Sequence, residues 1–316
     1  MRYVTIQGEK LSVIGLGTWQ FGSFEWGYGS GYLKDEAPKI VRAALDAGIN
    51  VVDTAEIYGL GRSERAVGKA IEGMRDRVFL ATKLAPVAPV PPIVQFRARL
   101  SARRLGVDVI DLYQLHWPNL VVPLSVTMRG MRALLDSGMV RLAGVSNYSL
   151  EAWKGADQAL GRPVFSNQVE FSLVARRPSR DLVPFATENE RLVIAYSPLA
   201  KGFLSAKYSP DNQPRNAVRR SNYLFSAENL ERAQQLFGVL RDIARRHDAD
   251  PSQVALAWVI KHPNTIAIPG ASSVDQVKKN AEAAQLELSD EEQCELTEAA
   301  AAFQPKKVGV AASFRR

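Results

Sequence analysis

Asn50-Val-Val-Asp53 is a short apolar run that ends in a carboxylate, and two later stretches of the chain have the same form. These are Val78-Phe-Leu-Ala-Thr-Lys83 and Val109-Ile-Asp-Leu-Tyr-Gln-Leu-His116. Each run is rich in β-branched residues and is followed by a helical pattern, which predicts parallel strands in βα units. Because the carboxyl ends of neighbouring strands meet at one mouth of an eightfold barrel, residues about 30 apart in the chain can meet there.

Four polar residues fall at or just past the ends of these runs: Asp53, Tyr58, Lys83 and His116. Taken alone, Asp53 is equally a turn residue and Tyr58 an ordinary loop aromatic. Lys83 ends an apolar strand, where an unpaired ammonium would be costly to bury, and Asp53 on the neighbouring strand is its natural partner. We therefore expect the four side chains to form one site.

The chemistry of such a site follows from proton affinities. A free tyrosine has a pKa of about 10, and an adjacent ammonium is expected to lower it, which would make Tyr58 a general acid. Asp53 would orient Lys83, and His116 would hydrogen-bond a substrate carbonyl oxygen. The set holds no nucleophile paired with a base, no zinc-ligand spacing and no carboxylate pair for glycoside hydrolysis. It is suited to protonating an oxyanion, and carbonyl reduction would also need a hydride donor.

Several motifs occur here in the order seen in aldo-keto reductases: Asp53-Thr-Ala-Glu-Ile-Tyr58-Gly, Thr82-Lys83, Leu115-His116, Gly144-Val-Ser-Asn147, Ala195-Tyr-Ser-Pro-Leu199 and Ile268-Pro-Gly-Ala-Ser-Ser273. The chain resembles that superfamily from about Leu11 to Asn280, and bacterial members most closely. The resemblance implies a single (β/α)8 TIM barrel domain over residues 1–316, with an N-terminal β-hairpin and long loops at the mouth. It also implies a catalytic tetrad at the four residues above.

The same resemblance implies that the chain binds NADPH. Ser146, Asn147 and Gln168 would hold the nicotinamide carboxamide, and Tyr196 would stack on the ring. An amide needs the donors and acceptors that such side chains supply. The pyrophosphate would lie along Ser197, Leu199 and Gly202.

The segment from Ile268 to Asn280 ends a strand and opens a helix, which makes an anion site at a helix N-terminus. Resemblance places the adenosine 2′-phosphate and the adenine among four residues: Gly270, Ser272, Gln276 and Asn280. The sequence departs from the common pattern at Gln276, where relatives carry Arg, and at Lys279, where many carry Glu. Lys278 and Lys279 are equally explained as a solvated helix face.

Aromatic residues gather in the loop after the first expected strand, residues 13–17, and directly after His116. Gly15, Gly17 and Gly22 are too widely spaced for the G-x-G-x-x-G motif of a Rossmann fold. We expect the aromatic side chains to form an apolar substrate site, since ligand sites are aromatic-lined. A loop that packs its own aromatics on the barrel is the alternative. The expected substrate residues are Trp19, Trp26, Tyr28 and Trp117.

The remaining pattern completes a barrel. Residues 5–13 fit a hairpin with its turn at Gln7-Gly8 that could close the barrel bottom. Helices are expected at about 35–47, 63–71, 93–105, 124–137, 150–160, 180–189, 227–246, 251–261, 274–284 and 290–303. Residues 209–225 form a long loop, either a lid over the cofactor or a solvated surface, and 304–316 a basic tail near the mouth.

Composition excludes several classes of protein. The net charge of +7 is scattered, with no basic motif interleaved with aromatics, which argues against nucleic-acid binding. One cysteine, no leader pattern and no bilayer-spanning run predict a cytoplasmic protein without membrane partners. We expect no metal site, and the expected partner is a small carbonyl substrate.

The expected function is NADPH-dependent reduction of aldehydes and ketones to alcohols, with Tyr58 as proton donor. One alternative is a Schiff-base lyase with Lys83 as nucleophile, which the pairing with Asp53 disfavours. The other is an NADPH-binding regulatory or redox-sensing subunit with slow turnover. The sequence leaves oligomeric state and substrate open, since loops rather than fold decide the latter.

Overall fold

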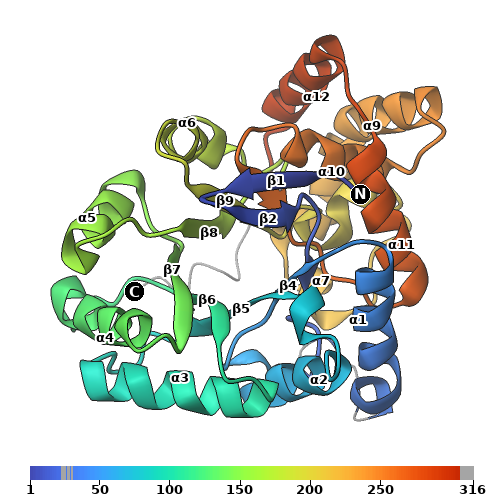
Figure 1. The fold of residues 1–316 in the computed structure, drawn as a ribbon. Coiled ribbons are helices and arrows are strands. Elements are labelled where there is room, and N and C mark those ends of the chain that lie inside the picture. Colours follow the sequence, from blue (N-terminus) through green and yellow to red (C-terminus); the bar gives the residue numbers. More distant parts are fainter. Residues whose placement is uncertain (23–25, 27–28, 30, 307–316) are drawn as a thin grey trace.

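In the computed structural model, which describes residues 1–22, 26, 29 and 31–306, eight parallel strands form one sheet in chain order (Figure 1). The strands are β3 (Leu16–Gly17), β4 (Val51–Asp53), β5 (Phe79–Leu84), β6 (Ile110–Leu115), β7 (Val140–Ser146), β8 (Ser166–Glu170), β9 (Leu192–Tyr196) and β10 (Thr265–Ala267). Parallel bridges from Ile14 to Ala267 and from Gly17 to Gly270 bring the first and last strands together. The expected (β/α)8 barrel is confirmed.

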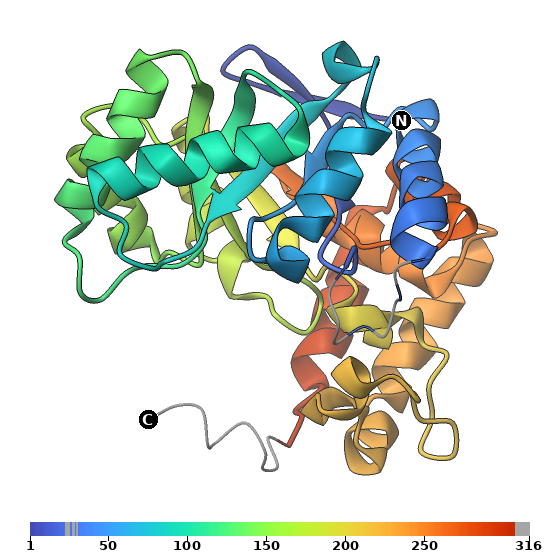
Figure 2. The ribbon, with the colours of Figure 1, turned by 90° about the horizontal axis from the view of Figure 1, so that it is seen from below.

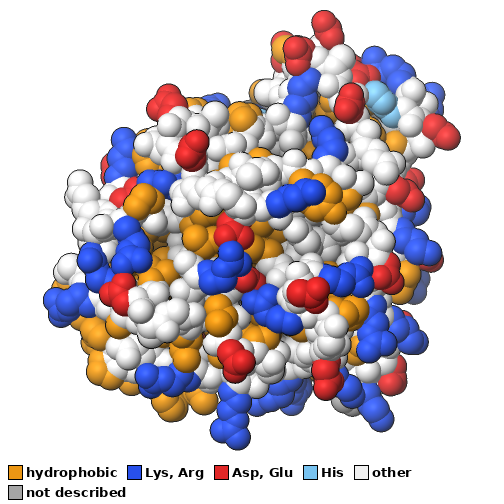
Figure 3. Space-filling model, in the orientation of Figure 1, with side chains coloured by type: hydrophobic (Ala, Val, Ile, Leu, Met, Phe, Trp, Pro, Cys, Tyr) orange, Lys and Arg blue, Asp and Glu red, His pale blue; other side chains and the backbone are white. Residues whose placement is uncertain are grey.

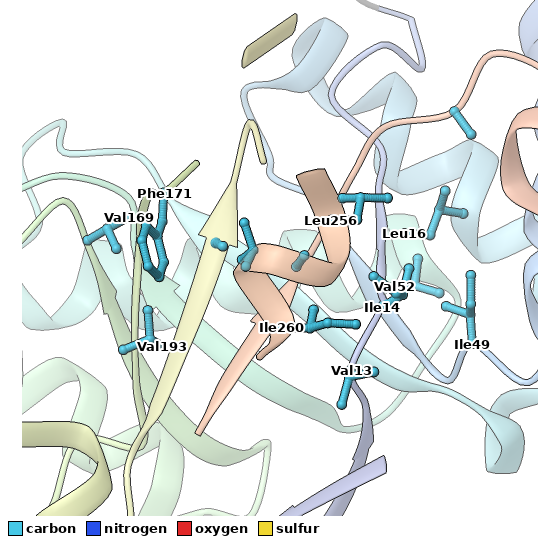
Figure 4. Close-up of a cluster of buried hydrophobic side chains, with 14 of the residues drawn as sticks. Val13, Ile14, Leu16, Ile49, Val52, Val169, Phe171, Val193, Leu256 and Ile260 are labelled. Carbon is cyan, nitrogen blue, oxygen red and sulfur yellow. The ribbon is translucent and has the colours of Figure 1, made fainter. Parts of the chain in front are cut away.

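Helices follow the strands and surround the sheet (Figure 1). They are α1 (Ala37–Asp46), α2 (Arg62–Ala70), α3 (Pro91–Leu105), α4 (Leu124–Asp136), α5 (Leu150–Leu160), α6 (Leu182–Glu188), α7 (Ala217–Arg220), α8 (Ala227–Arg232), α9 (Gln234–Arg246), α10 (Pro251–Ile260), α11 (Val274–Glu282) and α12 (Asp290–Ala302). Serine hydroxyls cap the first turns of several helices, as at Ser149, Ser273 and Ser289. Apolar side chains on the outer face of the strands pack against these helices (Figure 4).

The N-terminal hairpin closes the barrel at the end opposite the carboxyl ends of the parallel strands. Strands β1 (Tyr3–Ile6) and β2 (Glu9–Ser12) join through Gln7 and Gly8, whose φ angles of 49° and 85° fit a type I′ turn. Ile6 and Leu11 are buried in one cluster with inward-facing strand residues such as Phe165. The hairpin and the α7–α8 segment lie at opposite ends of the barrel (Figure 2).

Two expectations about the elements differ from the structure. The helix expected at 227–246 is broken at Ala233, which ends α8 and begins α9. Within the expected loop at 209–225, α7 and a 3-10 turn at Tyr223–Phe225 form, each capped by an asparagine side chain, Asn216 or Asn222. Such short helices show no apolar periodicity, so they depend on local capping rather than on pattern.

Charged side chains are interspersed on the molecular surface. On the hairpin face, basic and acidic groups alternate and no broad single-sign patch appears (Figure 3). Arg141, for instance, bonds Asp111 at 2.8 Å and Glu9 at 2.5 Å. In the part of the chain that the structure describes, no helix combines the length and apolarity that a membrane crossing requires.

The hairpin contact predicts a stability effect. Leu11→Ala should lower the free energy of unfolding by about 2–5 kcal/mol, because it leaves a cavity in the barrel interior. Urea denaturation measures the free energy of unfolding of both variants and of the parent protein. Thr5→Ala, an exposed change on the same hairpin, is the control and should stay within about 0.5 kcal/mol of the parent. If Leu11→Ala lowered the free energy of unfolding no more than Thr5→Ala does, Leu11 would not stabilise the barrel.

Candidate active site

The barrel strands deliver the four expected catalytic residues to one mouth. Asp53 is the last residue of β4, Lys83 lies near the end of β5, and His116 directly follows β6. Side chains alternate along a strand, so Lys83 and His116 face inward. Tyr58 lies in a 3-10 turn, Tyr58–Gly61, where Gly59 has a φ of 55° and passes too close to Gly22 for any side chain.

Lys83 is the centre of this cluster. Its Nζ lies 2.5 Å from Asp53 Oδ1, 2.7 Å from the Thr54 carbonyl oxygen and 3.4 Å from the Tyr58 hydroxyl. The Lys83 side chain is 0% exposed. Burial lowers the pKa of Lys83, while the charge of Asp53 acts in the opposite direction. The three contacts match the three protons of an ammonium and fix the group in place.

Two glutamines complete the environment of Asp53. Gln168 Nε2 donates to Asp53 Oδ2 at 2.8 Å, and Gln114 Nε2 donates to the same oxygen at 3.3 Å. Both carboxylate oxygens therefore have donors inside the barrel. Sequence reasoning missed Gln114, although a polar residue two positions before His116 in a buried strand shares its inward face and was a usable signal.

The pKa of Tyr58 moves in the direction opposite to the expected one. Burial raises its pKa well above 10, and the charge of Asp53 raises it further. The expectation that Lys83 lowers the pKa of Tyr58 is wrong because burial, together with the charge of Asp53, dominates the shift. Tyr58 therefore keeps its proton at neutral pH. It still suits proton donation, since an alkoxide is a stronger base than a phenolate.

His116 is held as a neutral imidazole beside Tyr58. Burial and the nearby Lys83 charge lower its pKa to about 2. The ring centroids of Tyr58 and His116 are 5.7 Å apart, with an interplanar angle of 78°. The imidazole of His116 also stacks on the indole of Trp117, with ring centroids 3.8 Å apart. His116 Nδ1 is buried without a hydrogen-bond partner among the described residues. A neutral imidazole has one N–H, which it can donate to a carbonyl oxygen.

The residues expected at the nicotinamide lie at the ends of the next three strands. Ser146 Oγ donates to the Gln168 carbonyl oxygen at 2.8 Å, and Asn147 Nδ2 donates to the His116 carbonyl oxygen at 3.1 Å. Tyr196 is half-buried and donates its hydroxyl to Asn147 Oδ1 at 2.9 Å. The structure therefore brings all four together beside the tetrad, with Gln168 also contacting Asp53.

The expected pyrophosphate residues form a turn directly after β9. Ser197, Lys201 and Gly202 have φ angles of 49°, 60° and 93°, and Leu199 lies between them in the chain. Backbone of this kind is a common anion-binding element.

The expected adenosine-phosphate segment is built around the start of α11. Ser273 caps the helix, and Gln276 Oε1 accepts from Ser272 N at 2.8 Å and lies 3.1 Å from Ser272 Oγ. Gly270 packs against Gln20, and Asn280 is buried. Lys279 donates to Asp250 Oδ2 at 2.6 Å, so its ammonium is engaged by the neighbouring helix segment.

The expected aromatic substrate residues are only partly described. Trp19 and Trp26 meet edge to face at 5.3 Å, with Lys201 over the first ring and Arg219 over the second. Trp117 is 42% exposed beside His116. Tyr28 lies outside the described residues. The long loop after Ser209 thus packs against the aromatic loop through Arg219.

Known proteins are similar to this chain in sequence and in fold. An uncharacterized oxidoreductase of Mycobacterium tuberculosis (strain H37Rv) is 54% identical over 310 residues, covering 98% of this chain and 96% of that protein. The solved glycerol dehydrogenase of Gluconobacter oxydans has a TM-score of 0.88 at 29% identity, covering 97% of each chain. An aldo-keto reductase of Klebsiella pneumoniae, solved with NADPH, has a TM-score of 0.75 at 31% identity, covering 98% of each. The family model for the aldo/keto reductase family matches residues 13–301, and the chain belongs to that family.

Proposed function

We propose that this protein is an NADPH-dependent oxidoreductase that reduces aldehydes and ketones to alcohols. The observation that carries the proposal is the buried pair of Asp53 and Lys83, with the Tyr58 hydroxyl 3.4 Å from the ammonium and the His116 ring beside Tyr58. The set can polarise a carbonyl oxygen and deliver a proton to it. Membership of the aldo/keto reductase family supports the same reaction class.

The residues beside the tetrad fit a nicotinamide coenzyme. Asn147 Nδ2 donates to Ser146 Oγ at 3.1 Å, and Ser146 Oγ donates to the Gln168 carbonyl oxygen at 2.8 Å, so amide and hydroxyl groups of the kind that bind a carboxamide lie together. The α11 N-terminus, with Ser272 and Ser273, suits a phosphate dianion. The relative from Klebsiella pneumoniae was solved with NADPH, which supports that choice. When bound, the coenzyme supplies the hydride.

The side chains of the site bind the carbonyl oxygen and supply its proton. His116 donates a hydrogen bond to the carbonyl oxygen and stays neutral, because its pKa of about 2 lies far below working pH. Tyr58 gives its hydroxyl proton to the oxygen as negative charge develops there. Lys83, 3.4 Å away, stabilises the phenolate that remains, and Asp53 holds Lys83 in position.

The geometry disfavours a Schiff-base lyase. Lys83 Nζ donates to Asp53, to the Thr54 carbonyl oxygen and towards Tyr58, so the ammonium form is the one that the site satisfies. A nucleophilic amine needs a free lone pair and access to substrate, whereas this side chain is fully buried.

Removing the proton donor should abolish turnover. Tyr58→Phe should reduce the rate of NADPH oxidation by aldehydes at least about 100-fold, because it removes the general acid. NADPH affinity, followed by quenching of tryptophan fluorescence, should hardly change. Tyr113→Phe is the matched control, since the Tyr113 hydroxyl is buried without a hydrogen-bond partner among the described residues and its side chain points to the opposite side of β6 from Gln114. Near-parental turnover in Tyr58→Phe, or no turnover in the parent protein over a panel of aldehydes and ketones, would refute the proposal.

Coenzyme preference tests the α11 site. The protein should bind NADPH more tightly than NADH, and the preference should shrink with salt because screening weakens the phosphate contact. Ser272→Asp should shift the preference towards NADH by placing a carboxylate against the phosphate. Ser289→Asp adds the same charge at the start of α12 and should leave the ratio of the NADPH and NADH dissociation constants unchanged. Equal dissociation constants for NADPH and NADH in the parent protein would contradict the assignment.

A further inference from the structure

A second, largely apolar pocket lies behind the catalytic residues. Its volume is about 170 Å³, and it is bounded by the ends of β5 and β6, the loops that follow them, and helices α4 and α5. Leu84 and Leu115 line it. Because strand side chains alternate, these two leucines face outward from the barrel while Lys83 and His116 face inward. The pocket therefore lies on the outer side of these strands, and Trp117 is the expected substrate residue that also lines it.

One polar group in this pocket lacks a partner. Thr127, on α4, lines the pocket and is 2% exposed, and its Oγ1 makes no hydrogen bond within the described residues. The Asn119 side chain, by contrast, is engaged with the Pro86 carbonyl oxygen at 2.7 Å and the Val122 amide at 2.6 Å. A buried hydroxyl without a partner is costly, so Thr127 marks a place where a ligand hydroxyl would be favoured.

The surroundings favour an apolar ligand. Ala152 and Leu124 contribute hydrocarbon surface, and the loop beside the pocket exposes Leu120 and Val121 at 98% and 88%. Apolar side chains this exposed at a pocket rim are typical of an interaction site. Burial raises the pKa of Tyr148, which also lines the pocket, to about 12, so its hydroxyl stays neutral and adds no charge.

Trp117 connects the pocket to the active site. The indole lines the pocket and also stacks on the His116 imidazole, with centroids 3.8 Å apart and planes within 15°. A molecule in the pocket would therefore touch the ring that stacks on the His116 imidazole.

We propose that this pocket binds a second small molecule, apolar and of single-ring size with one hydroxyl, which packs against Trp117 and hydrogen-bonds Thr127. The size follows from volume, since an engineered apolar cavity of about 150 Å³ takes up benzene. The polar requirement follows from the Thr127 hydroxyl, which is buried without a hydrogen-bond partner among the described residues. Binding at this pocket does not depend on the proposed reductase activity.

Phenol and toluene, which differ only in a hydroxyl and a methyl group, test the Thr127 contact directly. The parent protein should bind phenol more tightly than toluene in isothermal titration calorimetry. Thr127→Val, which keeps the shape but removes the hydroxyl, should weaken phenol binding about 2- to 10-fold and leave toluene unchanged or tighter. An unchanged phenol-to-toluene ratio in Thr127→Val would overturn the contact, and no binding of either probe would overturn the site.

A second pair of variants locates the probes. Ala152→Phe should fill the pocket and weaken the binding of both phenol and toluene at least about tenfold. Ala159→Phe places the same ring two turns further along α5, outside the pocket. This variant should bind phenol and toluene with the affinities of the parent protein. Phenol binding should also persist in Tyr58→Phe. If Tyr58→Phe lost phenol affinity, or if phenol competed with carbonyl substrates, the probe would lie in the mouth and the proposal would fail.

Discussion

The ion pair between Lys83 and Asp53 is the interaction on which the active site depends. An ammonium inside an apolar barrel is tolerable only when a carboxylate and further acceptors surround it, and here Asp53 and the Thr54 carbonyl oxygen do so. Asp53 is in turn held by Gln168 and Gln114. Strands β4, β5, β6 and β8 therefore have to meet in one register for the charges to be satisfied. The closed barrel supplies that register, and the hairpin fills its far end.

The same pairing sets the acid–base character of the neighbours. Burial raises the pKa of Tyr58, and the charge of Asp53 acts in the same direction, while burial and the charge of Lys83 lower the pKa of His116 to about 2. Both groups are consequently neutral over the working range. Tyr58 retains a proton to give, and His116 offers a hydrogen bond without adding positive charge. In the proposed mechanism, Lys83 stabilises the phenolate as it forms, because its ammonium lies 3.4 Å from the Tyr58 hydroxyl.

Much of this could be predicted from the sequence because it depends on local pattern. Strands that end in polar residues predicted the barrel mouth and the meeting of Asp53, Lys83 and His116. The direction of the Tyr58 pKa shift could not be predicted, because it depends on burial and on Asp53 as well as on Lys83. Long-range partners were also missed. Lys279 pairs with Asp250, 29 residues away, and the unpaired hydroxyl of Thr127 becomes visible only when α4 packs against the sheet.

The most direct test of the central claim is the pH dependence of single-turnover reduction in the parent protein and in Lys83→Met. With Tyr58 and His116 both neutral, the parent rate should vary little between about pH 6 and 9. Lys83→Met should be strongly impaired across that whole range, because nothing would stabilise the phenolate and Asp53 would be left unpaired. Its affinity for NADPH should be retained. A Lys83→Met protein that reduces aldehydes at the parent rate with the same pH profile would show that the ion pair does not govern proton transfer.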